Sequence, residues 1–214
     1  MKHFKIILLL LLAGLMSGQL QAQERLTAAQ KEIFRTRVKQ KVEEFQSSLS
    51  RIVDNGLKHE HRKEEVKKLL ALFMGKGEAY SYYDEELDRR VNSTGVKMQT
   101  SSVNRSYTGS QKLKNYIYKL YNPETGRSGT NYEKIKIESA DAVRVDNIQR
   151  VGDHYECTAY FYQKFTGYRD GRIIYSDGTS KKIRCFINVK DLPSGKKIYE
   201  ALLGDIYVLS TKRL

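Results

Sequence analysis

Tryptophan is absent from the 214-residue chain, and proline and cysteine each occur only twice. No internal repeat or low-complexity linker divides the sequence, which argues against an array of domains. No glycine-rich turn leads into a helical pattern, which argues against a phosphate-binding loop, and no serine-centred turn marks a hydrolase. The sequence therefore offers no template for a catalytic residue, and it predicts no cofactor.

Residues 1–22 have the pattern of a secretory signal peptide. Two lysines precede an apolar run at residues 6–16, and a short segment of small and polar residues ends at Ala22. The run is shorter than the roughly 20 residues of a membrane-spanning helix, and no cysteine follows it to carry a lipid. We expect cleavage after Ala22, one domain over residues 23–214 without a transmembrane segment, and a periplasmic or secreted protein.

Positive charge is in excess, because the formal net charge is +13. In an exported protein this charge does not indicate nucleic acid. It favours an unknown protein partner or an anionic partner of the cell envelope, such as an acidic glycan or anionic lipid. The 15 tyrosines suit a sheet with one face in contact with water.

Apolar residues at spacings of three and four predict three helices. The first covers about residues 25–55, with Thr27 and Gln30 as a capping box, and the second covers about residues 60–74. The third is expected to begin at Ser110 as its N-cap and to end before Pro123.

The strongest strand pattern covers residues 154–189, where apolar and polar residues alternate in two runs. Cys157 and Cys185 lie on the apolar faces, and antiparallel pairing of the runs places them opposite each other. Either two buried thiols or a cross-strand disulfide fits this pattern. Two Asp-Gly pairs between the runs, at Asp170 and Asp177, predict turns. The piece between these pairs is then either a small inserted strand or part of a hairpin tip.

Further strands are expected near residues 96–103, 132–138, 143–151 and 198–211, with a bulge at Gly204-Asp205 and an irregular strand around residues 80–83. Helices followed by a run of antiparallel strands indicate an α+β fold, in which N-terminal helices pack on one face of a bent antiparallel sheet.

The C-terminal half carries a pattern that can be compared with known folds. Its residues are Tyr162-Gln163-Lys164-Phe165, Arg169, Tyr175-Ser176-Asp177, Thr179, Lys181, Ile183 and Leu203-Gly204-Asp205-Ile206-Tyr207-Val208. With this order of elements, residues 25–211 resemble small exported proteins of Gram-negative gut bacteria with the cystatin-like, nuclear-transport-factor-like (NTF2-like) fold. The resemblance implies a long helix in the concavity of the sheet. It also implies a pocket that serves small ligands in some relatives and dimerisation in others, so a homodimer is one expectation.

Several residues with catalytic or metal-binding side chains have simpler interpretations. His61 and Glu65 share a helix face, but His59 does not, so solvated helix-start residues are favoured over a metal site. His154 falls on the more polar strand face, which disfavours a buried general base. Asp177 is assigned to a turn. We therefore predict no catalytic residues and no metal.

The best candidate binding surface combines cations with tyrosines on the strands, which suits anionic or sugar-like ligands, although an ordinary basic sheet face gives the same pattern. Its residues are Tyr160, Tyr162, Tyr168, Arg169, Arg172, Lys181, Lys182 and Arg184.

Three functions fit these observations. The first is an exported, non-enzymatic binding or scaffold protein of unknown ligand. The second is a small-molecule pocket protein, or an isomerase- or hydratase-like enzyme of the same fold. The third is a periplasmic component of an envelope or secretion assembly. A buried polar cluster under the helices favours the second, and an exposed apolar patch on the sheet favours the first or third.

Overall fold

A computed structural model describes residues 26–84, 87–121, 132–152 and 154–214. The predicted signal peptide lies outside these residues. Residues 33–214 form one compact unit, whereas residues 26–32 group separately. Within this first group the capping box is confirmed, because the Thr27 N–H donates to Gln30 Oε1 at 2.8 Å and the Gln30 N–H donates to Thr27 Oγ1 at 3.2 Å.

Three α-helices form in the described residues: α2 (Ala28–Ile52), α3 (His59–Ala71) and α4 (Leu113–Tyr121), with a short 3-10 helix, η1 (Met74–Gly77). The apolar stripe predicted for α2 is buried from Phe34 to Ile52, but Ile33 is exposed. The predicted start of the third helix is wrong, because Ser110 pairs in a strand and the helix begins at Leu113.

The strands form two sheets. The bounds are β1 (Tyr80–Asp84), β2 (Arg89–Ser93), β3 (Lys97–Thr100), β4 (Gly109–Lys112), β5 (Lys134–Ser139), β6 (Arg144–Val151), β7 (His154–Arg169), β8 (Arg172–Asp191) and β9 (Lys197–Arg213). Strands β1 and β2 pair with each other, and the larger sheet has the order β4-β3-β9-β8-β7-β5, with β6 also paired to β7. All pairs are antiparallel except β3 with β9, so the sheet is mostly antiparallel, as predicted.

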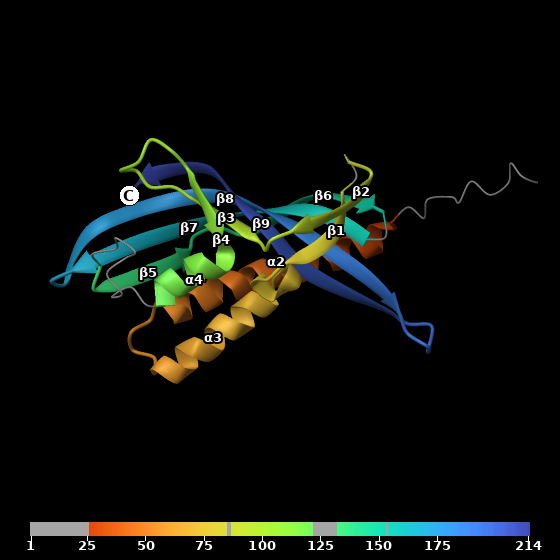
Figure 1. The fold of residues 1–214 in the computed structure, drawn as a ribbon, viewed down its shortest axis with the longest axis horizontal. Coiled ribbons are helices and arrows are strands. Elements are labelled where there is room, and N and C mark those ends of the chain that lie inside the picture. Colours follow the sequence, from red (N-terminus) through yellow and green to blue (C-terminus); the bar gives the residue numbers. More distant parts are fainter. Residues whose placement is uncertain (1–25, 85–86, 122–131, 153) are drawn as a thin grey trace, which may run out of the picture. The chain divides into compact units, whose positions relative to one another are not determined.

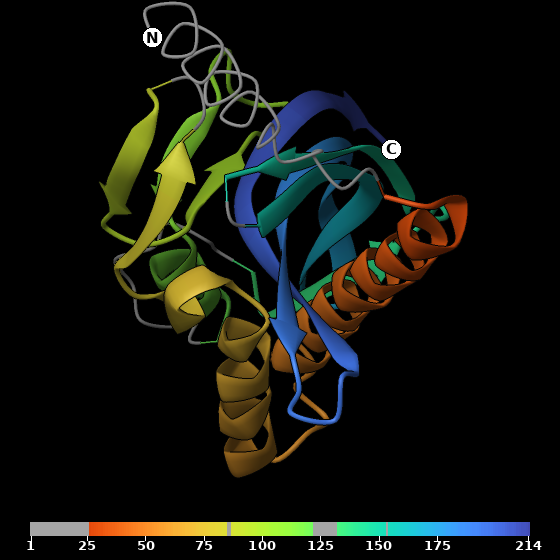
Figure 2. The same ribbon diagram turned by 90° about the vertical axis from the view of Figure 1, so that its right-hand side faces the viewer.

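The helices pack on one face of the larger sheet (Figures 1 and 2). The Phe45 ring of α2 meets the Phe161 ring of β7 edge to face, with centroids 6.1 Å apart. Ser50 Oγ donates to the Ile137 carbonyl of β5 at 2.5 Å. Helix α3 is held to α4 by Arg62, whose guanidinium donates to the Tyr121 carbonyl at 2.6 Å. These contacts confirm an α+β fold with helices on one side of the sheet.

Strands β7 and β8 form one long hairpin. Asp170 and Gly171 make its turn with φ of 50° and 70°, the positive values that a tight hairpin turn requires. The second predicted turn is wrong, because Asp177 and Gly178 lie inside β8 and are buried. The segment from Arg172 continues β8 and pairs with β7, so it is not a strand inserted between the long runs.

Gly178 is required by packing rather than by a turn. It lies beneath Tyr162 of β7, and a Cβ atom at position 178 would collide with the Tyr162 hydroxyl. Glycine in a strand often marks such a close approach of another group. An Asp-Gly pair therefore has two structural uses, and the sequence pattern alone does not distinguish them.

Cys157 lies directly opposite Cys185, as the register predicted, and both are buried free thiols in the structure. Burial raises the pKa of the Cys185 thiol, as does its hydrogen bond with Cys157. The predicted bulge in β9 is also confirmed, since Gly204 and Asp205 together oppose Arg184. None of the helices in the described part of the chain has the length and apolar character to cross a membrane.

Truncation of the two neighbouring aromatic residues of β7 tests the facing of this strand. Phe161 is 4% exposed and contacts Phe45, whereas Tyr160 is half-buried on the opposite face. We expect Phe161→Ala to lower the free energy of unfolding by about 3–5 kcal/mol and Tyr160→Ala to lower it clearly less. Denaturant titrations measure both values, and the reverse ranking would contradict the assignment of faces.

Candidate functional site

A cavity of about 430 Å³ lies between the helix-side face of the sheet, α4 and the segment that joins β3 to β4. We call it the helix-side cavity. Its lining residues are Thr100, Ser101, Ser102, Arg105, Gln111, Tyr116, Lys119, Leu120, Tyr132, Gln163, Phe165, Tyr175, Asp177, Thr179 and Lys181. Residues far apart in the sequence thus converge on one volume, and its size is within the usual range for small-molecule sites.

Lys181 of β8 and Gln163 of β7 are both buried polar residues of this lining, at 5% and 4% exposure. The Lys181 ammonium donates to Gln163 Oε1 at 2.5 Å, which fixes the orientation of the amide. The other end of that amide, Gln163 Nε2, is buried and has no hydrogen-bond partner among the residues that the structure describes. An unsatisfied buried donor is costly, so this donor is expected to receive a partner from outside the described part of the chain.

Burial lowers the pKa of Lys181 to about 8, because a buried ammonium loses its hydration. The Asp177 carboxylate opposes this shift through its charge but does not cancel it. Burial also raises the pKa of Asp177, against the effects of a hydrogen bond from Tyr175 and of the Lys181 charge. An amine with a lowered pKa and a carboxyl group with a raised pKa thus share the cavity.

Tyr175 holds Asp177 in place and closes one side of the cavity. Its hydroxyl forms a hydrogen bond with the Asp177 carboxylate and lies 2.8 Å from Ser102 Oγ. The Val103 N–H also donates to that hydroxyl at 3.2 Å. The segment after β3 is therefore tied to β8. Hydrogen bonds between residues such as Val103 and Tyr175, which are 72 positions apart in sequence, fix one wall of the cavity.

Aromatic rings form another wall. The ring centroids of Tyr132 and Phe165 are 5.7 Å apart, and those of Phe165 and Tyr175 are 6.0 Å apart. Gly167 makes room for Tyr132, because a Cβ atom at 167 would collide with its ring. Burial raises the pKa of the Tyr116 phenol, so this residue remains a neutral hydrogen-bonding group. The site combines flat apolar surfaces with buried donors, which suits a ring that carries an acceptor group.

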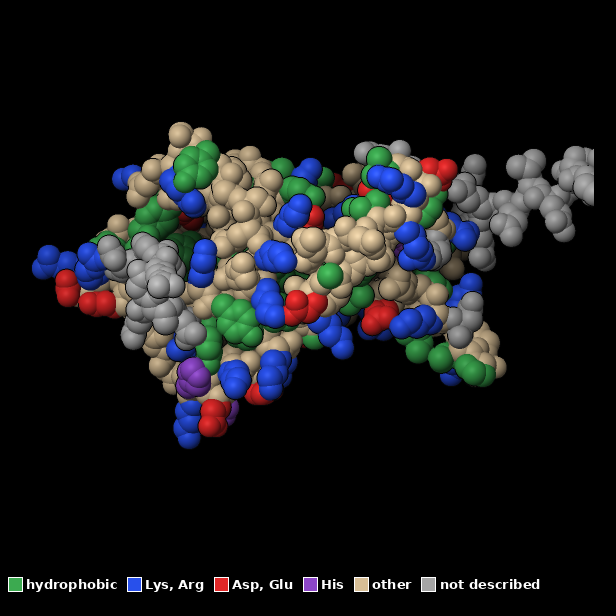
Figure 3. Space-filling view, in the orientation of Figure 1, with side chains coloured by type: hydrophobic (Ala, Val, Ile, Leu, Met, Phe, Trp, Pro, Cys, Tyr) green, Lys and Arg blue, Asp and Glu red, His purple; other side chains and the backbone are tan. Residues whose placement is uncertain are grey.

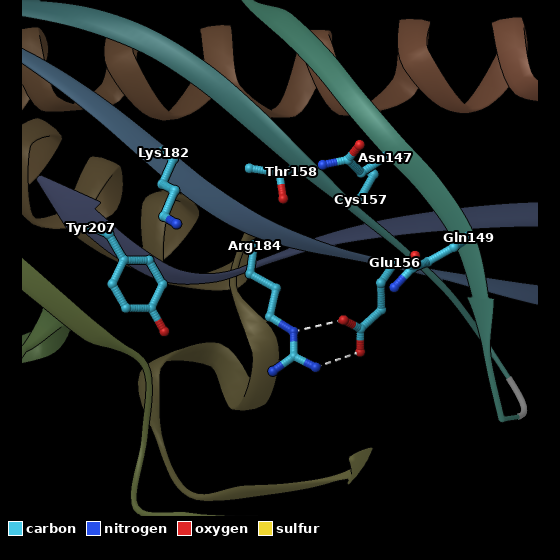
Figure 4. Close-up of a pocket in the computed structure, with 8 residues that line it drawn as sticks. All are labelled: Asn147, Gln149, Glu156, Cys157, Thr158, Lys182, Arg184 and Tyr207. Atoms are coloured by element: carbon cyan, nitrogen blue, oxygen red, sulfur yellow. Dashed lines mark hydrogen bonds and ion pairs between the residues drawn. The ribbon is translucent and has the colours of Figure 1, made fainter. Parts of the chain in front are cut away.

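The opposite side of the sheet has a shallower cavity of about 360 Å³, which we call the outer-face cavity (Figure 4). Its lining residues are Asn147, Gln149, Glu156, Cys157, Thr158, Lys182, Arg184 and Tyr207. Figure 4 shows the Arg184 guanidinium facing the Glu156 carboxylate, with two bonds of 2.7 and 2.8 Å. The Arg184 guanidinium also stacks on Tyr82 at 4.9 Å from the ring centroid. The positive charge of Arg184 is therefore already largely compensated by Glu156 and Tyr82.

His154 belongs to the same cluster on the face to which it was assigned, but it is buried, which corrects the expectation that it would not be a buried residue. It is 6% exposed, and its Nε2 lies 2.9 Å from Glu156 Oε1. Burial would raise the pKa of Glu156, but hydrogen bonds from His154 and Arg184 outweigh burial and lower it. The ionised Glu156 carboxylate is thus a partner for both His154 and Arg184, and these three side chains satisfy one another's hydrogen bonds.

The predicted surface residues do not form one site. Tyr160, Tyr162, Lys182 and Arg184 share the outer face, where Arg144 lies 4.6 Å over the Tyr160 ring and Lys212 lies 5.6 Å over the Tyr162 ring. The adjacent residue Lys181 points to the helix side, since successive residues of a strand face opposite ways. The other three predicted residues, Tyr168, Arg169 and Arg172, lie together at the end of the hairpin.

Lys and Arg side chains are spread over the molecular face shown in Figure 3 rather than gathered into one patch. The net positive charge therefore does not by itself define a site. The predicted helix-start residues are also tied into the structure: Glu65 pairs with Arg51 at 2.7 Å, and His59 stacks on Tyr121 with centroids 5.0 Å apart. The described residues contain no group of three or more His, Cys, Asp or Glu placed to hold a metal ion.

Asp177, Tyr175 and Gln163 belong to the helix-side cavity and are absent from the predicted site. A period-2 signal could have found them, because Tyr175, Asp177, Thr179 and Lys181 alternate along one face of β8. The Asp-Gly turn signal obscured this alternation. No protein-family model and no curated protein matches the chain.

The lowered pKa of Lys181 predicts a pH-dependent stability. Between about pH 8 and 10.5 the unfolded chain binds the Lys181 proton more tightly than the folded chain, so folding is favoured as pH rises. From pH 7 to 10, we expect the wild type to gain about 2–3 kcal/mol of unfolding free energy relative to Lys181→Met. Urea titrations across this range measure the difference. A constant difference would contradict a buried ammonium, and Lys182→Met serves as the control on the opposite face.

Proposed function

We propose that the protein is an exported, non-enzymatic binding protein and that the helix-side cavity is its ligand site. The observation that carries this proposal is a buried donor, Gln163 Nε2, which has no partner within residues 26–84, 87–121, 132–152 and 154–214. It lies beside a buried ammonium in a cavity of about 430 Å³. Native structures rarely bury such groups without a partner, so an acceptor supplied by a ligand explains the arrangement.

The cavity favours a small ligand with a flat ring and a carboxylate or carbonyl oxygen. That oxygen would accept hydrogen bonds from Lys181 and Gln163, and the ring would pack against Tyr132 and Phe165. Arg105 lines the same cavity and adds positive charge. One carboxylate, Asp177, faces these cations, so the lining favours an acid over a base.

The arrangement of helices and sheet supports assignment to the cystatin-like, NTF2-like fold, with α2 along a bent antiparallel sheet. In that fold a pocket between helices and sheet is the expected ligand site. An isomerase- or hydratase-like enzyme is the alternative for the same cavity, favoured by Asp177 as a carboxyl group held by Tyr175. A component of an envelope or secretion assembly, with a protein partner or a second copy on the sheet, is the remaining alternative.

A second candidate site is the outer-face cavity, with an anionic glycan as its ligand. Lys182 and Tyr207 supply a cation beside an aromatic ring, 5.6 Å apart, and Asn147 and Thr158 add polar groups. The bidentate pairing of Arg184 with Glu156 leaves this cavity with less uncompensated charge, so we rank it second.

Binding of ring carboxylates tests the proposed site. We expect 4-methylbenzoate to bind and Lys181→Met to weaken its binding at least tenfold, because the ammonium that faces the carboxylate is lost, an effect of about 1.4 kcal/mol. Gln163→Leu should also weaken binding, whereas Lys182→Met on the outer face should not. Titration by NMR or calorimetry gives the dissociation constants.

Two results of this titration would count against the helix-side cavity. Absence of saturable binding for a panel of small aromatic and alicyclic carboxylates would reject it. Weakening by Lys182→Met, with glucuronate bound and Lys181→Met neutral, would move the site to the outer-face cavity. Far-UV circular dichroism of each variant verifies that the fold is intact.

Export is tested by the mass and the thiols of the protein recovered from a periplasmic or culture fraction. The mature chain should begin at Gln23, because residues 1–22 have the features that signal peptidase recognises. A membrane pellet that retains residues 1–22 would reject export.

Thiol counting under denaturing, non-reducing conditions then distinguishes the two states of Cys157 and Cys185, a disulfide or two free thiols, which the opposed register allows in an oxidising compartment.

A further inference from the structure

Lys181 is the buried lysine of the described residues, and its side chain lines a cavity large enough for a small molecule. The other lysine of this lining, Lys119, is exposed and donates to Gln111 Oε1 at 3.0 Å. A buried lysine is unusual, because the ammonium loses its hydration and receives little in return here. Its position therefore needs an explanation beyond charge pairing.

We propose that Lys181 captures a ligand carbonyl as an imine, so that the ligands of the helix-side cavity are small aldehydes or ketones that carry a ring and an acid group. This inference rests on the proposed function, because it assigns the ligand class of the same cavity. It adds a reversible covalent bond to the contacts described above.

The groups around the amine have the placement that this reaction needs. Gln163 Oε1 accepts from Lys181 Nζ and orients the amine. Gln163 Nε2, unpartnered in the described part of the chain, is available to a carbonyl oxygen. Asp177 lines the same cavity and is close enough for its charge to act on Lys181, and the Tyr175 hydroxyl is hydrogen-bonded to its carboxylate. The carboxyl group can therefore give and take protons beside the amine.

The reaction balances without any further reactant. The neutral Lys181 amine adds to the carbonyl carbon, a C–N bond forms, and the carbonyl π electrons move to the oxygen, which takes up a proton. That proton comes from the nitrogen, which gives a neutral carbinolamine. The hydroxyl then takes a proton from the Asp177 carboxyl group and leaves as water, and the resulting iminium returns its remaining N–H proton to the carboxylate, so that a neutral C=N bond remains. Amine and carbonyl thus give imine and water, and no atom is oxidised or reduced.

The protonation state of Lys181 supports this chemistry. Burial brings its pKa from 10.5 to about 8. At pH 7 about one Lys181 side chain in ten is then neutral, which is roughly 300 times the fraction for a lysine with the unshifted pKa. A less basic amine is also a weaker nucleophile, so we expect a smaller advantage in rate, on the order of tenfold.

Reductive trapping tests the proposal. The folded full-length mature protein is incubated at pH 7 with 4-formylbenzoate and cyanoborohydride, and the modified lysines are identified by peptide mass spectrometry. We expect Lys181 to be labelled about tenfold faster than Lys182, which is its neighbour in β8 on the opposite face. Saturating 4-methylbenzoate, which has a similar shape but no aldehyde group, should slow labelling of Lys181 and leave Lys182 unchanged.

A second variant keeps the test independent of folding defects. Gln163→Leu leaves Lys181 in place but removes the amide that orients it, so Lys181 labelling should fall at least threefold while Lys182 labelling stays constant. Labelling of Lys181 at the rate of Lys182, or labelling that 4-methylbenzoate does not slow, overturns the inference. Binding of 4-methylbenzoate without selective trapping rejects the imine but leaves the proposed function intact. Failure of both rejects the proposed function as well.

Discussion

The register between β7 and β8 is the constraint on which the rest of the structure depends. Pairing of Cys157 with Cys185 sends Phe161 toward α2, and it sends Asp177 and Lys181 into the helix-side cavity. A slip of one residue would move every one of these side chains to the opposite face. Burial of the apolar side chains of β7 and β8 on the helix side therefore determines which polar side chains lie on each face of the sheet.

The two faces deal with buried charge in different ways. On the outer face Glu156 has two partners, Arg184 and His154, so its charge is compensated within the protein. On the helix side the direct hydrogen-bond partner of Lys181 among the described residues is a neutral amide, and Asp177 acts through its charge. A cluster in which every buried charge has a partner is expected of a structural element. A cluster in which a buried charge lacks a full set of partners is expected of a site that receives a ligand.

Much of the fold could be predicted from the sequence, because the strongest patterns arise from burial. The helical stripe that includes Val38, Val42 and Phe45, and the opposed cysteines, follow from the periods of helix and strand. The candidate site was predicted less well. Lys181 was grouped with Lys182 by composition, although strand geometry places the two on opposite faces. Asp177 was assigned to a turn because nothing in the local sequence shows that Gly178 is required by the packing of Tyr162. Convergence of segments around residues 102 and 175 is a tertiary property that no local pattern carries.

The aromatic wall of the helix-side cavity also has an optical consequence. Because the chain has no tryptophan, its ultraviolet emission comes from its 15 tyrosines alone. Tyr116, Tyr132 and Tyr175 line the cavity, and Tyr175 is hydrogen-bonded to a carboxylate, an arrangement that quenches phenol emission. A molecule that enters the cavity and disturbs that bond would change the emission of the whole protein. The cavity thus contains an intrinsic fluorescent reporter of its own occupancy.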